Sequence, residues 1–481
     1  MKEIGDLRSW LAAVDRMGEL TIIEGAHWDQ EIGCAAALNA QAGEPSALLF
    51  DNIRDYPKGY RVLTSSLTKP SRVALTLGLP TDYSATELQD ALREALSEWH
   101  QTWPDYPPEV VKSGPVMENI IEKDRVNLFS LPAPRWCQKD GGRYIGTGGA
   151  VITRDRDSGQ VNLGTYRTMV QDEKSVTMNI LPGKHGRFQY ESFHNRGEAS
   201  PVAISFGHDP LLFMVSSVNL PSGSEYHFAG AMQKKPLRVI QEEITGLPIP
   251  ADSEIVIAGW SRPDDKRLEG PFGEWHGYYA MHERLAPAIE VERIYHRHDP
   301  IILGMPNHRG NSEDSYWSAL MGSSILHTDA ERVGLPGIKR IWFHVGMGQM
   351  FVVASIKQMY AGHDKDVGLF ICSKRTATPM GRFVIIVDDD IDPSNFQEVI
   401  WALCTRCDPD KHIELISRTR TASLDPIVQP GTVKGTGFLS SRAIISACKP
   451  FEWIEDFPPD IRMAPELVAK VKEKWGRIMR L

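Results

Sequence analysis

Apolar side chains recur at helical spacing near the start of the chain and predict an α+β opening domain. In residues 6–17 they stand three or four positions apart, which is the period of one buried helix face. These positions are Leu7, Trp10, Leu11, Val14 and Met17. A short apolar segment at 20–23 predicts a strand, and a second helical pattern covers residues 85–99. Because the proline-rich stretch 103–108 then interrupts the pattern, we place the first domain at residues 1–115.

The pattern changes in the middle of the chain. From about residue 143 to residue 310, short runs rich in Val, Ile, Thr, Tyr and Phe are separated by turn signals such as Asp157-Ser158-Gly159. Runs of this kind are typical of strands joined by tight turns. We therefore predict a mainly β central domain at residues 116–315.

Buried strands alternate with helices in the last third of the chain. The apolar runs 351–356 and 382–387 predict strands. After the second run, Asp392-Pro393 offers an N-cap followed by proline in the first helical turn, and the helix is predicted to continue over residues 395–407. This alternation indicates a C-terminal α/β domain at residues 325–481.

The last predicted element is a helix at residues 464–480 with one apolar face. That face carries Leu467, Val471, Trp475 and Ile478. The face could pack against its own domain or against a partner subunit. Since no internal repeat is present, a solenoid is excluded, and the fold class predicted for the whole chain is α+β multidomain.

Composition narrows the class of protein further. The chain has 481 residues, of which 42% are hydrophobic and 24% charged, as in ordinary globular proteins. Its formal net charge of −9 gives no basic excess for neutralising phosphates, so we expect no nucleic-acid partner. Six thinly spread cysteines predict free thiols. With neither a signal-peptide pattern nor a long apolar run, we expect a cytoplasmic protein without a membrane span.

The segment Glu269-Gly-Pro-Phe-Gly-Glu274-Trp-His-Gly277 is the strongest candidate for chemistry. Glycine and proline set unusual backbone angles, while glutamate side chains carry protons. The segment thus indicates two acids presented from a shaped loop. Taken alone, it is equally well explained as a polar surface turn.

Two weaker motifs favour structural explanations. Cys404 and Cys407 have the spacing of a redox or zinc motif, but they fall inside a predicted helix without a second such pair. The acidic run 388–390 could bind a divalent cation, although acidic residues before a helix are favoured by its dipole anyway. We therefore assign neither of them a function.

A mixed set of possible metal ligands lies earlier in the chain. Asn162, His185 and Glu225 offer an amide oxygen, an imidazole and a carboxylate, a combination that suits Mn²⁺ or Mg²⁺. By spacing alone the signal is weak. The alternative is that Asn162 caps a turn, Arg167 forms a surface ion pair and His185 has no special role.

These pieces, in this order, resemble the UbiD family of prenylated-flavin-dependent decarboxylases. The matching pieces are Asn162 with Arg167, His185, Ser224-Glu225 before Ala229-Gly230-Ala231, and Glu269 to Glu274 followed by His276-Gly277. The resemblance extends over nearly the whole chain, including residues 140–144 and the helix around Trp401. It implies a central domain of the split-barrel type found in flavin reductases.

The resemblance also implies a cofactor and metals. Asn162, His185 and Glu225 would hold Mn²⁺ or Mg²⁺, which would bridge to the phosphate of prenylated FMN. The side chains matching the cofactor-binding segments are Thr165, Tyr166, Arg167, Lys184, His185 and, near the phosphate, Lys434. The backbone oxygens that match a potassium site of the family belong to Ser216, Ser217 and Val218.

The chemistry of decarboxylation agrees with such a cofactor. Loss of carbon dioxide from an aromatic or unsaturated acid leaves an electron pair on an sp² carbon, and no amino-acid side chain is an adequate sink for it. The resemblance then implies a catalytic trio. Arg167 would orient two acids and meet the substrate carboxylate, Glu274 would donate a proton after carbon dioxide leaves, and Glu269 would tune the network.

We therefore predict a carboxy-lyase that acts reversibly on an aromatic, hydroxylated or otherwise substituted aryl acid. Tyr166, the segment Gly304-Met305-Pro306 and the stretch 404–409 look closer to family members acting on hydroxylated acids. The alternatives are a physiological carboxylase, a decarboxylase of a non-phenolic unsaturated or heteroaromatic acid, a metal-dependent hydrolase using the Asn/His/Glu site, and a non-catalytic oligomerising protein. The expected partners are a flavin prenyltransferase that supplies the cofactor and further copies of this chain in a homodimer or homohexamer.

Overall fold

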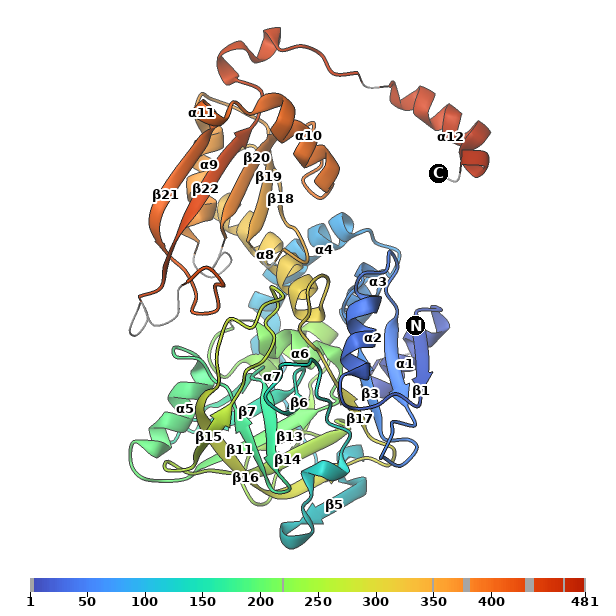
Figure 1. The fold of residues 1–481 in the computed structure, drawn as a ribbon, viewed down its shortest axis with the longest axis vertical. Coiled ribbons are helices and arrows are strands. Elements are labelled where there is room, and N and C mark those ends of the chain that lie inside the picture. Colours follow the sequence, from blue (N-terminus) through green and yellow to red (C-terminus); the bar gives the residue numbers. More distant parts are fainter. Residues whose placement is uncertain are drawn as a thin grey trace.

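The computed structural model describes residues 4–218, 220–347, 350–374, 381–428, 437–461 and 463–479. Figure 1 shows an N-terminal part beside a large central sheet, with a C-terminal domain joined to both through helix α8 (Glu313–Arg332). The α+β multidomain fold predicted from the sequence is confirmed.

The N-terminal sheet includes a strand from much later in the chain. Its order is β1-β2-β3-β17, and β17 runs parallel to β3. The four strands are β1 (Leu20–Glu24), β2 (Ala47–Asp51), β3 (Arg61–Thr64) and β17 (Ile301–Leu303). The helices of this part are α1 (Leu7–Arg16), α2 (Glu31–Asn39), α3 (Pro70–Thr76) and α4 (Ala85–Thr102).

Helix α1 confirms the first predicted element. Its N-cap, Asp6, accepts a hydrogen bond from Ser9 N at 2.8 Å, which satisfies one of the backbone donors left open at a helix start. The predicted apolar face is buried at Leu7, Trp10, Leu11 and Val14. Burial of this face attaches the helix to the rest of the molecule.

The central part is a curled, mainly antiparallel sheet of ten strands. Its order is β6-β9-β10-β16-β14-β11-β7-β8, with β15 and β5 also paired to the long strand β16. The strands are β5 (Asn119–Glu122), β6 (Arg143–Gly146), β7 (Ala150–Arg154), β8 (Val161–Gly164), β9 (Thr168–Asp172), β10 (Ser175–Met178), β11 (Ser200–Phe206), β14 (Ile255–Ser261), β15 (Lys266–Glu269) and β16 (Arg284–His296).

Three helices and a small sheet accompany the central sheet. The helices are α5 (His185–His194), α6 (Pro210–Ser217) and α7 (Glu225–Gln233). All three pack against β8. The small sheet has the order β13-β12-β4 and consists of β4 (Glu109–Val110), β12 (Arg238–Gln241) and β13 (Pro248–Pro250).

The C-terminal domain is a five-stranded mixed sheet with the order β18-β19-β20-β22-β21. Its strands are β18 (Ile338–Phe343), β19 (Phe351–Ile356), β20 (Phe383–Asp388), β21 (Ile413–Arg420) and β22 (Leu439–Ala447). Its helices, besides α8, are α9 (His363–Ser373), α10 (Phe396–Arg406) and α11 (Pro409–His412). The two strands predicted for this domain are therefore confirmed as β19 and β20.

The start of α10 differs from the prediction. Its N-cap is Asn395, whose Oδ1 accepts a hydrogen bond from Gln397 N at 3.1 Å, whereas Asp392 lies in the preceding turn and binds Ser394. The proline after Asp392 therefore shapes that turn and does not begin the helix.

The acidic run 388–390 does not cap a helix either. Buried Asp388 accepts a hydrogen bond from Arg406 Nη1 at 3.0 Å, and Asp390 accepts one from Arg406 Nη1 at 2.8 Å. These charges are neutralised within the domain. The run is thus explained by a structural ion-pair cluster and not by the dipole of the following helix, which begins after Asn395.

The terminal helix α12 (Pro465–Met479) presents its apolar face to solvent. Leu467 is 51% exposed and Ile478 is 79% exposed. Figure 1 shows α12 standing apart from the rest of the chain at the end of a long extension. Within the described residues, the helix does not pack on its own domain. No helix in the described part of the chain is long and apolar enough to span a membrane.

A buried glutamate at the first turn of α8 gives the stability of the fold a pH dependence. Glu313 is 1% exposed, and its Oε1 accepts a hydrogen bond from Ser66 N at 3.1 Å. Burial raises the pKa of Glu313 to about 7, so the folded protein binds a proton that the unfolded chain releases near its ordinary pKa of 4.5. The stability contributed by that proton is lost as the pH rises through 7.

We expect Glu313→Gln to stabilise the protein at pH 8 by about 2–3 kcal/mol and to change its stability little at pH 5. Glutamine keeps the oxygen that accepts from Ser66 N but never ionises. Unfolding curves of both proteins at the two pH values measure the difference. An equal effect at both pH values would show that ionisation of Glu313 is not the cause.

Candidate active site

The two glutamates of the acidic loop meet Arg167 in a buried cluster. Glu269 ends β15, Glu274 lies five residues further on, and Arg167 lies between β8 and β9. Arg167 donates to Glu269 Oε1 from Nε at 2.7 Å, to Glu269 Oε2 from Nη2 at 3.0 Å, and to Glu274 Oε1 from Nη1 at 2.8 Å. Glu269 is fully buried and Glu274 is 6% exposed. The surface-turn explanation is therefore wrong.

Glycines allow the acidic loop to take this shape. Gly270 has φ +98°, a backbone conformation that L side chains rarely adopt. Gly141 approaches the loop closely, because its N–H donates to Pro271 O at 2.9 Å and an added Cβ would lie 1.9 Å from Gly270 O. The turn at Gly141 thus braces the backbone that separates the two glutamates.

Glu269 accepts two further hydrogen bonds that sequence reasoning missed. Tyr144 OH donates to its Oε1 at 3.0 Å, and Asn179 Nδ2 donates to its Oε2 at 3.0 Å. With the two bonds from Arg167, four hydrogen bonds hold this buried carboxyl group in one orientation. Tyr144 belongs to the conspicuous run 140–144, but nothing in the sequence links it or Asn179 to Glu269.

Electrostatic interactions within the cluster keep both Arg167 and Tyr144 protonated. Burial opposes the charge of Arg167, but its hydrogen bonds to Glu269 and the charges of both glutamates outweigh burial and raise its pKa. Burial, and then the negative charge of Glu269, raise the pKa of Tyr144, so the phenol keeps its proton. Phe272 covers the guanidinium, with its ring centroid 5.2 Å from Arg167 Cζ. The charge of Arg167 is thus held against two buried acids and shielded from water.

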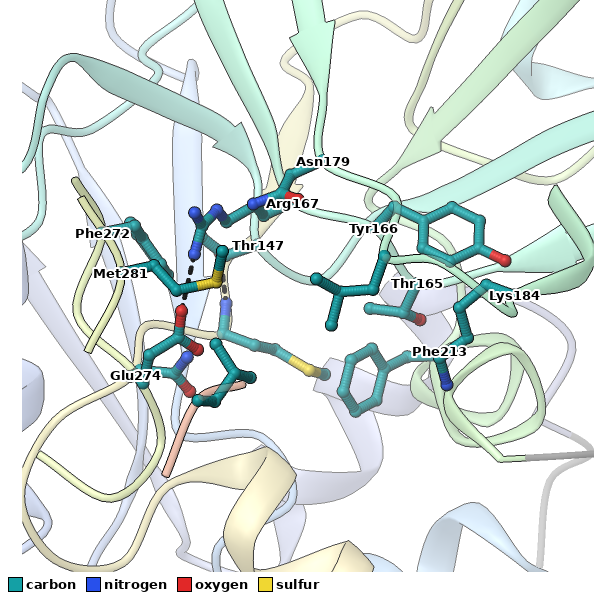
Figure 2. A pocket seen from close by; sticks show the side chains of 14 residues that line it. Thr147, Thr165, Tyr166, Arg167, Asn179, Lys184, Phe213, Phe272, Glu274 and Met281 are labelled. Atoms are coloured by element: carbon teal, nitrogen blue, oxygen red, sulfur yellow. Dashed lines mark hydrogen bonds and ion pairs between the residues drawn. The ribbon is translucent and has the colours of Figure 1, made fainter. Parts of the chain in front are cut away.

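A cavity of about 200 Å³ lies beside this cluster. Figure 2 shows Arg167, Glu274, Thr147 and Met281 gathered toward one end, and Thr165, Lys184 and Phe213 toward the other. Glu274 lines the cavity, whereas Glu269 lies behind it. The remaining lining residues are Tyr166, Asn179, Leu181, Phe272, Met305, Asn307 and, from the C-terminal domain, Leu424.

Residues 165 and 166 are fixed by contacts with α6 and α5. Thr165 N donates to Ser216 O at 3.0 Å, and the two hydroxyl oxygens lie 2.9 Å apart. Tyr166 OH accepts from Gly186 N at 3.3 Å, and an added Cβ at Gly164 would lie 2.3 Å from the Tyr166 ring. The cavity-lining segment before Arg167 therefore has a defined backbone.

The three candidate ligands of a divalent metal come from neighbouring elements. Asn162 is on β8, while His185 and Glu225 are the first residues of α5 and α7, which both pack against β8. Asn162 Nδ2 and Glu225 Oε2 are buried without a hydrogen-bond partner among the described residues. Burial raises the pKa of Glu225 to about 7, against weaker stabilisation by backbone N–H groups. The unpartnered, buried carboxylate oxygen of Glu225 fits a cation, to which Asn162 would present its amide oxygen.

The potassium site and Lys434 stay predictions. Ser216 O, one of three proposed potassium ligands with Ser217 and Val218, already accepts a hydrogen bond from Thr165 N. Lys434 lies outside the described residues. All six cysteines are free thiols, as predicted, and Cys404 is exposed on α10. Among the described residues no group of three His, Cys, Asp or Glu could hold a metal; the candidate set contains two such residues, with an amide from Asn162.

Comparison with known proteins gives matches along most of the chain. Residues 11–92, 109–310 and 317–447 match the N-terminal, Rift-related and C-terminal domains of 3-octaprenyl-4-hydroxybenzoate carboxy-lyase, UbiD. A phenolic acid decarboxylase of Streptomyces sp. (strain D7) is 31% identical, covering 95% of this chain and 93% of the relative. A phenolic acid decarboxylase of Sedimentibacter hydroxybenzoicus is 33% identical over 88% of each chain.

Solved structures also match this chain over nearly its whole length. The vanillic acid decarboxylase of Sedimentibacter hydroxybenzoicus in its open form superposes with a TM-score of 0.83, at 30% identity and over 100% of both chains. The UbiD-class enzyme HmfF from Pelotomaculum thermopropionicum, solved in complex with FMN, shares the fold with a TM-score of 0.83 at 24% identity, over 96% of this chain and 98% of its own.

Fold and site together define a multidomain α+β protein that holds an acid–guanidinium–acid cluster beside a cavity. The matches specify its class, because they span the three domains and include relatives above 30% identity over most of both chains. The chain belongs to the UbiD family of carboxy-lyases. The family resemblance noted from the sequence is confirmed, and the hydrolase and non-catalytic alternatives are set aside.

Proposed function

We propose that this protein catalyses the reversible, non-oxidative decarboxylation of a hydroxylated or otherwise substituted aryl carboxylic acid, with prenylated FMN and a divalent metal. The observation that carries the proposal is the buried cluster of Arg167, Glu269 and Glu274 beside the cavity. A carboxylate substrate needs a cation to receive it, and the carbon that loses carbon dioxide needs an acid to protonate it. The cluster offers both.

The surroundings of the two glutamates support different roles for them. Glu269 is fully buried and accepts four hydrogen bonds, so its carboxylate is committed to orienting Arg167. Glu274 lines the cavity, and Arg167 contacts it through one nitrogen. An acid that reaches the cavity is placed to give a proton to a bound molecule. We therefore assign proton donation to Glu274 and support of the network to Glu269.

Arg167 serves both glutamates in this scheme. Its planar guanidinium uses three nitrogens to bind two carboxylates and also lines the cavity. A substrate carboxylate entering the cavity meets this positive charge. Phe272 and Met281, which also line the cavity, keep water away from the charged group and strengthen its attraction for the substrate.

The local structure supports a phosphate and a metal near α5. The N-cap residue Lys184 makes no side-chain cap, and the positive end of the α5 dipole favours an anion such as the FMN phosphate at this N-terminus. Asn162, His185 and Glu225 would hold Mn²⁺ or Mg²⁺ there, while Thr165, Tyr166, Arg167 and Lys184 would contact the cofactor, and Lys434 its phosphate. When bound, prenylated FMN would supply the electron sink that side chains lack. Potassium at Ser216–Val218 remains a prediction.

Loss of a metal ligand is expected to release the metal and flavin together. In Glu225→Ala, the proposed metal site loses its one carboxylate, so a metal and the flavin phosphate whose charge it would neutralise would both be held less tightly. We expect purified Glu225→Ala to contain at most about a tenth of the wild-type manganese and bound flavin. Elemental analysis and flavin absorbance measure both. Wild-type contents of metal and flavin in this variant would contradict the assignment, and Glu243→Ala, on an exposed side chain, serves as control.

Two features support an aryl acid as the substrate. The relatives that resemble the chain over most of its length are named phenolic acid decarboxylases. The apolar side chains Leu181, Phe213, Met281 and Met305 all line the cavity and suit an aromatic ring. The alternatives within this class are a physiological carboxylase and an enzyme for a non-phenolic unsaturated or heteroaromatic acid.

The partners follow from the same proposal. A flavin prenyltransferase would have to supply the cofactor. The exposed apolar face of α12 supports assembly into a homodimer or homohexamer, because a helix with Leu467 and Ile478 half or more exposed has unburied apolar surface.

Carbon dioxide release tests the proposed function directly. Protein co-produced with a flavin prenyltransferase is incubated with hydroxylated and unsubstituted aryl acids, and the gas evolved is measured. Release that depends on both the protein and the prenylated cofactor is expected. The proposal fails if the cofactor-loaded protein releases no carbon dioxide from any aryl acid.

A further inference from the structure

Two neutral polar side chains of the cavity have no part in the proposed reaction. Thr165 Oγ1 is engaged by Ser216 Oγ, and Tyr166 OH by Gly186 N. Asn179 gives its Nδ2 to Glu269, and its Oδ1 is buried. The two that remain are Thr147 and Asn307, which line the cavity together with Arg167 and Glu274.

The orientation of the Asn307 amide is set by its neighbour. Asn307 Nδ2 donates to Gly273 O at 3.2 Å. A backbone carbonyl can only accept, so the nitrogen faces Gly273 and Oδ1 faces away from it. Oδ1 accepts no hydrogen bond from the described residues, and it does not belong to the buried polar atoms that lack a partner. Asn307 therefore offers an accessible hydrogen-bond acceptor in the lining of the cavity.

Thr147 adds a donor to the same lining. Its Oγ1 accepts from Met305 N at 2.8 Å, which places the hydroxyl beside the segment that leads to Asn307. No described residue accepts the hydroxyl hydrogen of Thr147. Figure 2 shows Thr147 at the end of the cavity where Arg167 and Glu274 lie. A polar pair of this kind complements a group that both donates and accepts, as a ring hydroxyl does.

The apolar surroundings make the acceptor selective. Met281, Met305 and Leu424 offer no strong hydrogen-bonding group to a ligand that fills the cavity. A ligand with a hydroxyl near Asn307 Oδ1 donates to it, whereas the methyl ether of the same ligand displaces water and leaves Oδ1 unpaired. A buried acceptor left without its partner costs enough to change affinity roughly 10- to 100-fold.

We propose that Asn307 is a specificity-determining residue, which selects aryl acids carrying a ring hydroxyl over their O-methylated counterparts. The proposal rests on the decarboxylase function proposed above. It adds that the protein recognises a ring hydroxyl of the substrate by a hydrogen bond. Arg167 binds the carboxylate of the acid, and Asn307 accepts from a hydroxyl elsewhere on the ring. Asn307 contacts Gly273, so the selecting residue also lies against the loop that carries Glu274.

The test compares matched acids on cofactor-loaded protein. Benzoic acids with a hydroxyl at position 3 or 4 are each paired with their methyl ether, and kcat/KM for carbon dioxide release is measured for both members. Wild-type protein is expected to prefer the hydroxylated member of at least one pair by roughly 10- to 100-fold. Asn307→Leu, which keeps the branched shape of the side chain but removes the acceptor, is expected to lose most of that preference through slower turnover of the hydroxylated acid.

A ratio is the right readout because Asn307→Leu also removes the bond to Gly273. Any resulting shift of Glu274 slows both members of a pair and cancels in the ratio. Asn307→Asp keeps an acceptor oxygen and is expected to retain the preference. Flavin absorbance of each variant shows that the cofactor is still bound.

The outcomes separate the two proposals. If no hydroxylated acid is decarboxylated by loaded wild-type protein, the proposed function on such acids fails and this inference with it. If acids are decarboxylated but wild type shows no preference within any pair, or Asn307→Leu keeps the wild-type preference, the function stands and the role of Asn307 is wrong.

Discussion

Glu274→Gln is expected to lower the rate of decarboxylation by roughly 10²–10⁴-fold, the usual contribution of a general acid. Glutamine keeps the shape of the side chain and an oxygen that can accept from Arg167 Nη1, which Glu274 contacts at 2.8 Å. It has no acidic proton to give to the carbon that loses carbon dioxide. The loss is therefore expected in kcat, with cofactor binding unchanged.

Steady-state release of carbon dioxide, with flavin content determined on the same preparations, measures this effect. Glu283→Gln is the matched control, because Glu283 is exposed and lies nine residues further along the same region of the chain. We expect the control to keep wild-type turnover. Full turnover by Glu274→Gln with cofactor bound would remove Glu274 from the role of proton donor.

Arg167→Met is expected to be the most destabilising single change in the site. The substitution leaves the carboxylates of Glu269 and Glu274, which are 0% and 6% exposed, without their shared cation. Breaking a buried ion pair by removing one partner costs about 3–5 kcal/mol, because a charge remains buried without compensation. Activity is expected to fall with stability, since the substrate carboxylate loses its cation as well.

Thermal unfolding of Arg167→Met and Arg196→Met in one buffer compares a buried with an exposed pair. Arg196 also binds a carboxylate through two nitrogens, at 2.9 and 3.0 Å from Asp157, but it lies at the surface. Exposed pairs contribute about 0–1 kcal/mol, so Arg196→Met is expected to unfold close to wild type. Equal, small effects of both substitutions would mean that Arg167 does not hold two buried charges.

Local elements were predictable from the sequence because their signals are local. The helical spacing of Leu7, Trp10 and Val14 predicted helix α1, and unbroken apolar runs predicted strands β19 and β20. The buried face of a helix or strand requires apolar residues at a regular spacing, whatever that face packs against. The exact start of a helix is less certain, and α10 begins after Asn395 because two capping residues compete within four positions.

Contacts between distant segments were not predictable in the same way. No periodicity indicates that β17 joins β3, or that Tyr144 and Asn179 donate to Glu269. These segments are separated by 90 or more residues, and only the tertiary fold brings them together. The acidic run 388–390 was misjudged for the same reason, because its partner Arg406 approaches from α10.

The candidate site was predictable only as a set of residues. Glycine, proline and glutamate in the acidic loop indicated a shaped, acidic segment, and family resemblance linked it to Arg167. The three-dimensional arrangement added what distinguishes the two acids: Glu269 lies behind Arg167 with four hydrogen bonds, and Glu274 lines the cavity. Such a difference depends on burial and direction, which a spacing of five residues does not encode.

The central claim is that this chain works with prenylated FMN, and the mass spectrum of its released ligand tests the claim most directly. Protein co-produced with a competent flavin prenyltransferase is purified and denatured, and the mass of the released ligand is determined. We predict the mass of prenylated FMN, at close to one equivalent per chain. Release of no flavin, or of unmodified FMN alone under conditions in which the prenylated cofactor is available, would contradict the account.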